Sequence, residues 1–347
     1  MAKDASGGAP TLEMVARVAG VSRATVSRVV NGSPKVSPEV AAAVNDAVKR
    51  LRYVPNRAAR SLASRSSNAI ALVVPEDVTT FFGDPYFAEI VKGIMSRIDD
   101  SDYVLNLLVA SSDPRHKTRA YLESGVVDGA LVISHHTGDE IVLADSTVPL
   151  VFGGRPVDGL VEGATYVDVD NEAAAEVGTR HLIDLGRRRI GSITGPLDMR
   201  AGVDRLDGYR AAVSAAGLPD DLVESGDFTA EGAAAATRRL LDRVGASARG
   251  SDGPGIDALF VASDLMASGA LAVLAERGLR VPDDVAVVGF DDSPVATRTA
   301  VPLTTVAQPS EEQGRTMAEL LIRLISGDDD VPKQTILPTR LVVRESA

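Results

Sequence analysis

The chain has 347 residues, which is too long for one ordinary hydrophobic core, so two or three domains are expected. Hydrophobic residues make up 45% of it and charged residues 24%, as is typical of a globular protein and not of a disordered one. The absence of cysteine excludes disulfides, thiolate metal sites and cysteine nucleophiles. Residues 1–10 do not look like a signal peptide, and no apolar run reaches the ~18 residues of a membrane span, so we expect a cytosolic protein.

Charge is divided unevenly along the chain, whose net charge is −12. Residues 1–66 carry eleven Lys and Arg but four Asp and Glu side chains, a net charge of +7, so the other 281 residues carry −19. A basic segment attracts polyanions such as nucleic acid, whereas an acidic body is repelled by them. The charge distribution therefore indicates a small nucleic-acid-binding part that is attached to a larger part with another task.

The basic segment is predicted to form three short helices. Thr11 can cap the first, whose apolar residues recur at helical spacing until Gly20. Ser22 can cap the second, which should end near Asn31, just before a Gly-Ser-Pro sequence. Residues 37–39, Ser-Pro-Glu, combine a cap, a proline at the first helical position and an acid in the first turn, and they predict the start of the third helix.

The second of these helices has two different faces. One face is an apolar stripe of Val26, Val29 and Val30, and the opposite face carries small, polar and basic residues, namely Arg23, Ala24, Ser27, Arg28 and Asn31. Guanidinium groups suit bidentate hydrogen bonding to guanine in the major groove, and the short hydroxyls near the helix start suit phosphates. A solvated helix face without function is the alternative, but the neighbouring capped helices argue against it.

Residues 11–32, TLEMVARVAGVSRATVSRVVNG, resemble the helix-turn-helix of the lactose-repressor (LacI/GalR) family of bacterial transcription regulators. The resemblance continues through residues 53–63, YVPNRAARSLA, and more loosely to the end of the chain. It implies a sequence-specific repressor that binds a palindromic operator in double-stranded DNA as a homodimer. It also implies that Arg23, Ala24 and Arg28 read bases, with weak discrimination by the alanine, which offers only a contact to a thymine methyl group.

Residues 56–64 form a separate short segment of good helix formers. The segment is too short for a stable isolated helix, because nucleation is costly below roughly 12 residues. The resemblance implies a hinge helix that orders only on DNA, with Leu62 as a wedge in the minor groove; an ordinary linker is the alternative. The predicted DNA-binding residues are Thr11, Leu12, Ser22, Arg23, Ala24, Thr25, Ser27, Arg28, Asn31, Tyr53, Asn56, Arg57, Ala59, Arg60 and Leu62.

From residue 70 onward, short apolar runs alternate with amphipathic helical stretches, which is typical of a parallel sheet covered on both faces. Strands are predicted at residues 70–74, 104–109, 130–134, 150–152, 190–194, 259–262 and 285–290. Helices are predicted at about residues 86–100, 115–124, 172–185, 205–216, 230–244, 264–277 and 310–326. This number of βα units favours two doubly wound lobes over one sheet.

The resemblance implies an α/β fold in which the all-α helix-turn-helix head and hinge helix precede a two-lobed, periplasmic-binding-protein-like effector domain with doubly wound parallel sheets. We expect a DNA-binding domain at residues 1–55, a hinge at 56–66 and an effector-binding and dimerisation domain at 67–347. The resemblance further implies that the lobes exchange strands. Lobe one should take about residues 67–168 and 299–329, and lobe two about 169–298 and 330–347.

Ligands of open α/β sheets lie beyond the carboxyl ends of the strands. This rule selects five segments, which are residues 76–87, 134–136, 153–155, 263–264 and 291–292. The first is rich in aromatic residues, whose rings can stack on a sugar face or on a base, or can simply pack beneath the loop. The sequence alone does not decide between a sugar and a base.

The resemblance implies a small effector between the lobes, with Arg205 as its binding arginine, Ser263 at a pocket position and Asp291 as a ligand-bonding aspartate. A guanidinium group and a carboxylate suit a polyhydroxyl ligand, most simply a sugar that acts as inducer, although a structural salt bridge is the alternative for this pair. The predicted effector-binding residues are Phe81, Phe82, Tyr86, Phe87, Ser134, His135, Asp170, Arg205, Ser263, Asp264, Phe290 and Asp291.

No catalytic, metal or cofactor site is predicted. His135 and His136 are adjacent at a predicted strand end, so their side chains should point to opposite faces and would not chelate one metal ion. The alternatives are a solute-binding protein for transport, a sugar-modifying enzyme, and a purine- or nucleoside-responsive or corepressor-dependent regulator of the same family. The basic head argues against the first, and no Walker loop, dinucleotide fingerprint or nucleophile elbow is present to support the second.

Overall fold

The computed structural model describes residues 10–30, 35–54, 66–109, 117–143, 146–156, 163–246 and 255–347. The chain divides into two compact units, residues 1–67 and residues 68–347, which are described separately. No helix among the described residues is long and apolar enough to cross a membrane. Asn31 and the predicted hinge residues Asn56, Arg57, Ala59, Arg60 and Leu62 lie outside the described residues.

The first unit contains the three predicted helices, α1 (Leu12–Ala19), α2 (Arg23–Val30) and α3 (Pro38–Leu51). Thr11 caps α1 by accepting a hydrogen bond from the Met14 amide at 3.3 Å, and Gly20 ends it in the left-handed conformation, with φ 67°. One residue from each helix is completely buried, and together they form the centre of a small core, namely Val15, Val26 and Val44.

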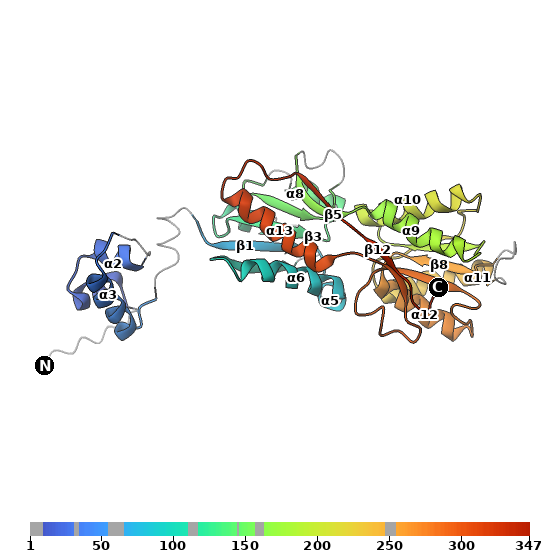
Figure 1. Ribbon diagram of the computed structural model, residues 1–347, viewed down its shortest axis with the longest axis horizontal. Helices are drawn as coiled ribbons and strands as arrows, with labels where there is room; N and C mark the ends of the chain where they lie inside the picture. The colour runs from blue at the N-terminus through green and yellow to red at the C-terminus, as the bar shows by residue number, and fades with distance from the viewer. Residues whose placement is uncertain are drawn as a thin grey trace. The chain divides into compact units, whose positions relative to one another are not determined.

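The second unit is built from two six-stranded sheets, each of which forms a lobe (Figure 1). In lobe one the strand order is β11-β5-β4-β3-β1-β2, and all neighbours are parallel. Its strands are β1 (Ala69–Val74), β2 (Val104–Val109), β3 (Gly129–Ile133), β4 (Leu150–Gly153), β5 (Thr165–Val169) and β11 (Gln334–Leu337). Helices α6 (Pro85–Ile98) and α13 (Ser310–Ile325) pack on one face, and α7 (Lys117–Glu123) and α8 (Thr137–Leu143) pack on the other. The short α5 (Val78–Gly83) follows β1.

In lobe two the strand order is β12-β10-β9-β8-β6-β7, and only β12 is antiparallel to its neighbour among the described strands. Its strands are β6 (Ile190–Thr194), β7 (Val223–Ser225), β8 (Ala258–Val261), β9 (Ala286–Asp291), β10 (Thr304–Ala307) and β12 (Arg340–Val342). Helices α9 (Asn171–Asp184) and α10 (Arg200–Ala215) cover one face, and α11 (Ala230–Val244) and α12 (Asp264–Glu276) cover the other. Both sheets are therefore doubly wound.

The chain crosses between the lobes three times, after β5, after β10 and after β11. The prediction for the last part of the chain was therefore wrong in two places: residues 304–307 pair with β9 in lobe two, and residues 334–337 pair with β5 in lobe one. Helix α13 lies in lobe one beside α6, as predicted (Figure 1). The assignment was made from the family resemblance alone. Hydrogen bonds between strands far apart in sequence decide where such short strands lie, and they were not part of that assignment.

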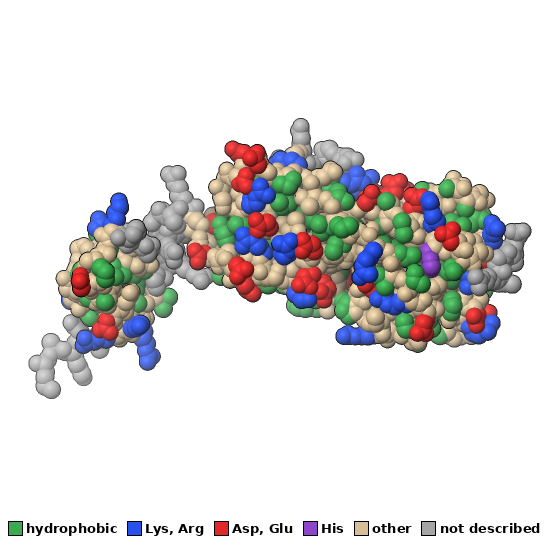
Figure 2. Space-filling model, viewed as in Figure 1, with side chains coloured by type: hydrophobic (Ala, Val, Ile, Leu, Met, Phe, Trp, Pro, Cys, Tyr) green, Lys and Arg blue, Asp and Glu red, His purple; other side chains and the backbone are tan. Residues whose placement is uncertain are grey.

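Helices α6 and α13 approach each other closely through two glycines. A Cβ atom at Gly93 would lie 1.8 Å from the Glu311 carbonyl oxygen, and one at Gly314 would lie 2.2 Å from the Ile90 carbonyl oxygen. Basic and acidic side chains lie close together on this face of lobe one (Figure 2). Lys92 and Arg97 of α6 pair with Glu311 and Glu319 of α13. The glycines thus allow α13, from the end of the chain, to complete lobe one.

Candidate functional site

A cavity of about 480 Å³ lies between the lobes at the carboxyl ends of both sheets. Segments that follow β1, β3 and β4 line it from lobe one, and segments that follow β6, β7, β8 and β9 line it from lobe two. The volume lies within the range of small-molecule sites, and its position is the one that open α/β sheets use for ligands.

Arg205 is held rigidly at the floor of this cavity. It lies in α10 and is buried, with Nε donating to Asn171 Oδ1 at 2.9 Å and Nη1 donating to the Ala262 carbonyl at 2.6 Å. Its guanidinium group stacks 3.7 Å above the centre of the Phe290 ring. Burial lowers the pKa of Arg205 below its ordinary value, and the carboxylate of Asp291 is the largest of the charges that oppose this shift.

Asp291 faces Arg205 from the end of β9. Its Oδ1 lies 3.8 Å from Arg205 Nη1 and accepts a hydrogen bond from Gln308 Nε2 at 2.7 Å. Burial raises the pKa of Asp291 well above its ordinary value, whereas the charge of Arg205 lowers it. The residue has φ 112°, which an aspartate rarely adopts, so the surrounding structure must hold it there.

A second carboxylate of the floor, Asp168, is fixed by backbone hydrogen bonds. Its Oδ2 accepts from the Arg155 amide at 2.8 Å, and its Oδ1 accepts from the Val169 amide at 2.7 Å and from Asn171 Nδ2 at 3.0 Å. Burial raises the pKa of Asp168, and these hydrogen bonds oppose the shift. Because Asn171 also binds Arg205, the acid, the amide and the guanidinium form one connected polar floor.

Three aromatic side chains contribute to the cavity wall, namely Tyr86, Phe87 and Phe228. Phe228 follows β7 and has φ 61°, a left-handed conformation that is strained for a bulky residue. The prediction for the other two rings of the aromatic segment was wrong. Phe81 is buried in the core of lobe one, and Phe82 is 75% exposed and does not line the cavity.

Direct contacts join the lobes at the rim of the cavity. His136, after β3, places Nδ1 3.0 Å from Asp198 Oδ2 of lobe two and Nε2 3.3 Å from Glu76 Oε1 of its own lobe. The hydrogen bond with Glu76, with a smaller contribution from Asp198, raises the pKa of His136 to about 9, so the ring is charged at neutral pH. Arg155 of lobe one donates to Asp204 Oδ2 of lobe two at 2.8 Å.

The structure brings together seven of the predicted effector-binding residues as cavity-lining residues: Tyr86, Phe87, Ser134, His135, Arg205, Ser263 and Asp291. Five others do not line it: Phe81, Phe82, Asp170, Asp264 and Phe290. Asp170 caps α9 through a hydrogen bond from the Ala173 amide, and Phe290 lies beneath Arg205. Phe290 precedes Asp291 in β9, and adjacent side chains of a strand point to opposite sides. Asp264 begins α12, and its carboxylate accepts hydrogen bonds from Thr305 and Ser293 instead of lining the cavity.

Several polar or aromatic lining residues were missed: Glu76, Asp84, His136, Arg155, Asp168, Asn171, Asp198, Phe228 and Gln308. Glu76, Asp84, His136 and Arg155 stand in segments that the strand-end rule had selected, so that rule could have found them. Asp168, Phe228 and Gln308 belong to or follow β5, β7 and β10, which were not predicted as strands. Among the described residues, no group of three His, Asp or Glu side chains is placed to hold a metal ion.

The head carries a separate exposed surface on α2. Arg23, Ala24 and Arg28 are exposed, and Arg23 pairs with Glu13 of α1 at 3.1 Å. Ser22 Oγ accepts a hydrogen bond from the Thr25 amide at 3.1 Å and so caps the helix. Two further predicted DNA-binding residues lie elsewhere: Tyr53 is buried in the head core, and Leu12 packs against it.

Comparisons with known proteins match both units. Residues 11–56 match the family described as bacterial regulatory proteins, lacI family, and residues 179–347 match a periplasmic binding protein-like domain. The chain is 47% identical over 342 residues to the HTH-type transcriptional regulator CelR of Thermobifida fusca, a match that covers 97% of this chain and 98% of CelR. It is 35% identical over 324 residues to the ribose operon repressor of Escherichia coli K12, with 91% and 93% covered.

Two solved structures resemble the whole chain. A complex of the transcriptional regulator CelR with cellobiose is 46% identical, has a TM-score of 0.76 and covers 97% of this chain and 100% of its own. The lac repressor dimer bound to operator and the anti-inducer ONPF is 30% identical, has a TM-score of 0.85 and covers 98% of this chain and 99% of its own. Both likenesses extend over head and lobes alike.

Proposed function

Because the chain belongs to the lacI family of bacterial regulatory proteins, we propose that it represses transcription by binding a palindromic operator as a homodimer and is released from DNA by a sugar. It is a regulator and not an enzyme. Its basic head reads DNA, and its two-lobed unit senses the effector. As a regulator of bacterial genes, it acts in the cytoplasm.

The single observation that carries the sugar proposal is the fixed pairing of Arg205 and Asp291 at the floor of the cavity. A sugar hydroxyl both donates and accepts hydrogen bonds, so it can bind a guanidinium group and a carboxylate at once. Two of the guanidinium nitrogens are already engaged by Asn171 and the Ala262 carbonyl, and no described residue accepts from Nη2. The arginine is thus immobilised before ligand arrives, which lowers the entropy cost of binding.

The first candidate effector is cellobiose. A structure of CelR, which shares 46% of its residues with this chain, contains that disaccharide. Polar side chains occur at two depths in the cavity, around Arg205 at the floor and around His136 at the rim, so a ligand of two linked rings can bond at both levels. A monosaccharide could bond at only one of these levels.

A purine or nucleoside is the second candidate, and the aromatic side chains Tyr86, Phe87 and Phe228 favour it. Aromatic rings stack on a base as readily as on the apolar face of a sugar. The many carboxylates of the cavity, however, suit a ligand with several hydroxyl donors. Adenosine and hypoxanthine are therefore the purine ligands against which cellobiose is compared.

The effector acts by changing the relative arrangement of the lobes. A ligand shifts such an equilibrium only by its difference in affinity for the two arrangements, and contacts to both lobes supply that difference. Because coupling is reciprocal, operator DNA must weaken effector binding by the same factor by which effector weakens DNA binding. In this proposal the change is transmitted to the head through residues 56–64, which lie outside the described residues.

The head binds the operator through α2. Arg23 and Arg28 reach base edges in the major groove, and Ser22, Thr25 and Ser27 bind phosphates near the helix start. Arg23 must exchange its ion pair with Glu13 for this contact; both side chains are more than half exposed, so the exchange costs little. A homodimer presents two such helices to the two half-sites of a palindrome.

The proposal is tested by thermal unfolding of the purified protein with cellobiose, ribose, adenosine and hypoxanthine. A ligand at 100 times its Kd stabilises the folded protein by about 2.7 kcal/mol. We expect cellobiose to raise the melting temperature and the other three to leave it unchanged. If only adenosine or hypoxanthine raises the melting temperature, the effector is a purine or nucleoside and not a sugar.

A further inference from the structure

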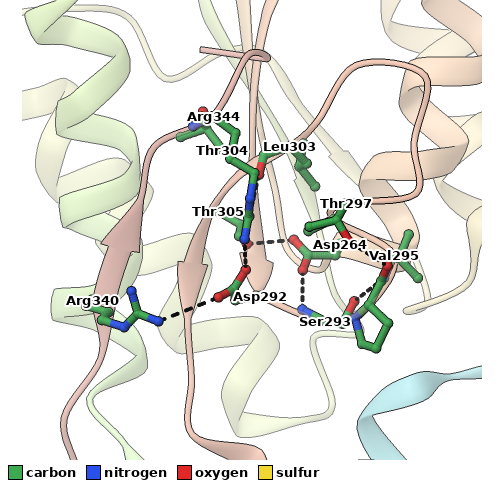
Figure 3. A network of polar contacts seen from close by, with 12 residues as sticks. Asp264, Asp292, Ser293, Val295, Thr297, Leu303, Thr304, Thr305, Arg340 and Arg344 are labelled. Carbon is green, nitrogen blue, oxygen red and sulfur yellow. Dashed lines mark hydrogen bonds and ion pairs between the residues drawn. The ribbon is translucent and has the colours of Figure 1, made fainter.

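Asp264 is a buried carboxylate directly behind the effector cavity. It is the first residue of α12 and has no solvent exposure, whereas its neighbour Ser263 lines the cavity. Its Oδ1 accepts a hydrogen bond from Thr305 Oγ1 of β10 at 2.6 Å, and its Oδ2 accepts one from the Ser293 amide at 2.8 Å (Figure 3). One carboxylate therefore ties together the helix start, a strand and the turn that follows β9.

The turn held by Asp264 has an unusual backbone. Asp291 and Asp292 both have positive φ, 112° and 58°, and two consecutive non-glycine residues in such conformations cost about 1–3 kcal/mol each. A strained turn persists only where its surroundings determine it. The hydrogen bond from the Ser293 amide to Asp264 comes directly after the second strained residue.

The other side of the turn is anchored by the end of the chain. Asp292 pairs with Arg344 and lies 3.9 Å from Arg340 of β12 (Figure 3). Gln308, which follows β10, donates a hydrogen bond from its backbone N–H to the backbone carbonyl of Asp291 at 3.2 Å. Asp264 thus holds the turn from the helix side, and these residues hold it from the strand side.

The sequence of β9 is adapted to this carboxylate. A Cβ atom at Gly289 would lie 2.5 Å from Asp264 Oδ1. Any larger residue at this position would displace the carboxylate from the two groups that it binds. The glycine therefore leaves room for Asp264 against the strand that carries Asp291.

We propose that Asp264 is a positioning residue for the effector: it holds the turn 291–293 so that the Asp291 carboxylate projects into the cavity towards Arg205. This inference rests on the proposed function, because it assumes that Asp291 binds the effector. Asp264 itself does not contact the ligand. Its two carboxylate oxygens accept the hydrogen bonds that fix the Ser293 amide and the Thr305 hydroxyl.

Two substitutions separate the acceptor role from the charge. Asp264→Ala removes both hydrogen bonds. Asp264→Asn keeps both, because the amide oxygen can accept from the Ser293 amide while the amide nitrogen donates to Thr305, whose hydroxyl can rotate to accept. Thr305→Val removes one hydrogen bond with little change of shape and serves if the alanine variant does not fold.

The matched control is Asp257→Ala. Asp257 is also fully buried and also accepts two backbone hydrogen bonds, from the amides of Arg188 and Arg189, but it lies at the other end of β8. Its loss should destabilise lobe two by a comparable amount without touching the turn 291–293. If Asp264 contributed only to stability, Asp264→Ala and Asp257→Ala would have the same effect on cellobiose affinity and on hydrogen exchange at Ser293.

The experiment measures cellobiose affinity by calorimetry and amide hydrogen exchange at Ser293 for each variant. We expect Asp264→Ala to weaken cellobiose binding at least tenfold and to speed exchange at Ser293. Thr305→Val should weaken binding at least threefold, and Asp264→Asn and Asp257→Ala should stay within threefold of the wild type. In an Asp291→Asn background, Asp264→Ala should weaken binding less than threefold further, since it acts through Asp291.

The proposal is overturned if Asp264→Ala binds cellobiose like the wild type, or if its effect is undiminished in the Asp291→Asn background. If the wild type itself does not bind cellobiose, the proposed effector is wrong. Exchange at Ser293 needs no sugar and still decides whether Asp264 holds the turn: unchanged exchange in Asp264→Ala overturns the proposal, and faster exchange in that variant but not in Asp257→Ala supports it.

Discussion

His136 Nδ1 lies 3.0 Å from Asp198 Oδ2, and this contact pairs a side chain of lobe one with a side chain of lobe two at the rim of the cavity. The same imidazole also contacts Glu76, so one charged ring faces two carboxylates. Opening of the lobes must separate His136 from Asp198. The contact therefore contributes to the equilibrium between open and closed lobes.

Stability from His136 should depend on pH. Its pKa is raised to about 9 in the folded protein, so the stabilisation is fully present below the ordinary pKa of 6.5 and is lost as pH rises through about 9. At about pH 6.5, His136→Asn should lower the melting temperature by roughly 2–4 °C, as expected for about 1 kcal/mol. The difference between the two proteins should shrink steadily and vanish above about pH 9 in a thermal unfolding series.

Glu319→Gln is the control for this series. Glu319 pairs with Arg97 within lobe one, and carboxyl and guanidinium groups ordinarily titrate outside the range from about pH 6 to 9. The effect of this substitution should therefore be constant over the range. A constant effect of His136→Asn as well would show that the imidazole charge contributes nothing to the contact between the lobes.

Arg205→Lys should shift the response to effector to higher sugar concentrations without abolishing operator binding. Lysine keeps the charge but cannot reproduce the fork that binds Asn171 and the Ala262 carbonyl. Loss of a charged hydrogen bond costs about 1.5–3 kcal/mol, so cellobiose affinity should fall at least ~10-fold. Arg210→Lys, at an exposed arginine of the same helix, should behave as the wild type in the same titration of the protein–operator complex.

Arg28→Ala should relax base preference at one operator position. The side chain is exposed on α2, and a bidentate contact to a base is worth about 1–3 kcal/mol of discrimination. Selection from random DNA, followed by affinity measurements on single-base variants, measures this preference. Arg50→Ala, at an exposed residue of α3, is the control and should leave base preference intact. Equal weakening by Arg28→Ala on every sequence would instead make Arg28 a phosphate contact.

Gly314→Ala should destabilise lobe one. The new methyl group would meet the Ile90 carbonyl oxygen at 2.2 Å, so α6 and α13 would have to separate, at a cost of about 1–3 kcal/mol. Gly83→Ala in α5 meets nothing within 4 Å and is the matched control, which should be neutral or slightly stabilising. Urea denaturation measures both. Equal stability of the two variants would mean that the helices can adjust without cost.

The local sequence pattern predicted the elements in which apolar residues recur at regular helical or strand spacing. All three helices of the head were predicted, and β2, β6 and α11 have the predicted bounds. Helix α10 begins five residues before its predicted start, because Gly202 and its polar neighbours do not show the apolar spacing of a helix in the first turn. Strands β5, β7, β10, β11 and β12 were not predicted, since they are short and are defined by distant hydrogen-bonding partners.

Only part of the candidate site was predicted, because the sequence locates the ends of strands better than it shows the direction of each side chain. The strand-end rule found the segments that contain Ser263 and Asp291, but it could not tell which of two adjacent side chains faces the cavity. Asp264 and Asp292 are the chain neighbours of those residues, and they face the supporting network behind the cavity instead (Figure 3). Where a strand was missed, as with β7, its site residue Phe228 was missed with it.

Repression and its release by sugar are measured together as operator binding in the presence and absence of effector. A symmetric site is first selected from random DNA, and its affinity for the full chain is then measured by fluorescence anisotropy over a range of cellobiose concentrations. We predict tight binding of a palindrome without sugar and an operator affinity at least tenfold lower with saturating cellobiose. For Arg205→Lys, the same loss of operator affinity should need at least ~10-fold more cellobiose. Failure to enrich any symmetric site, or a wild-type affinity that cellobiose leaves unchanged while the sugar binds, would contradict the account.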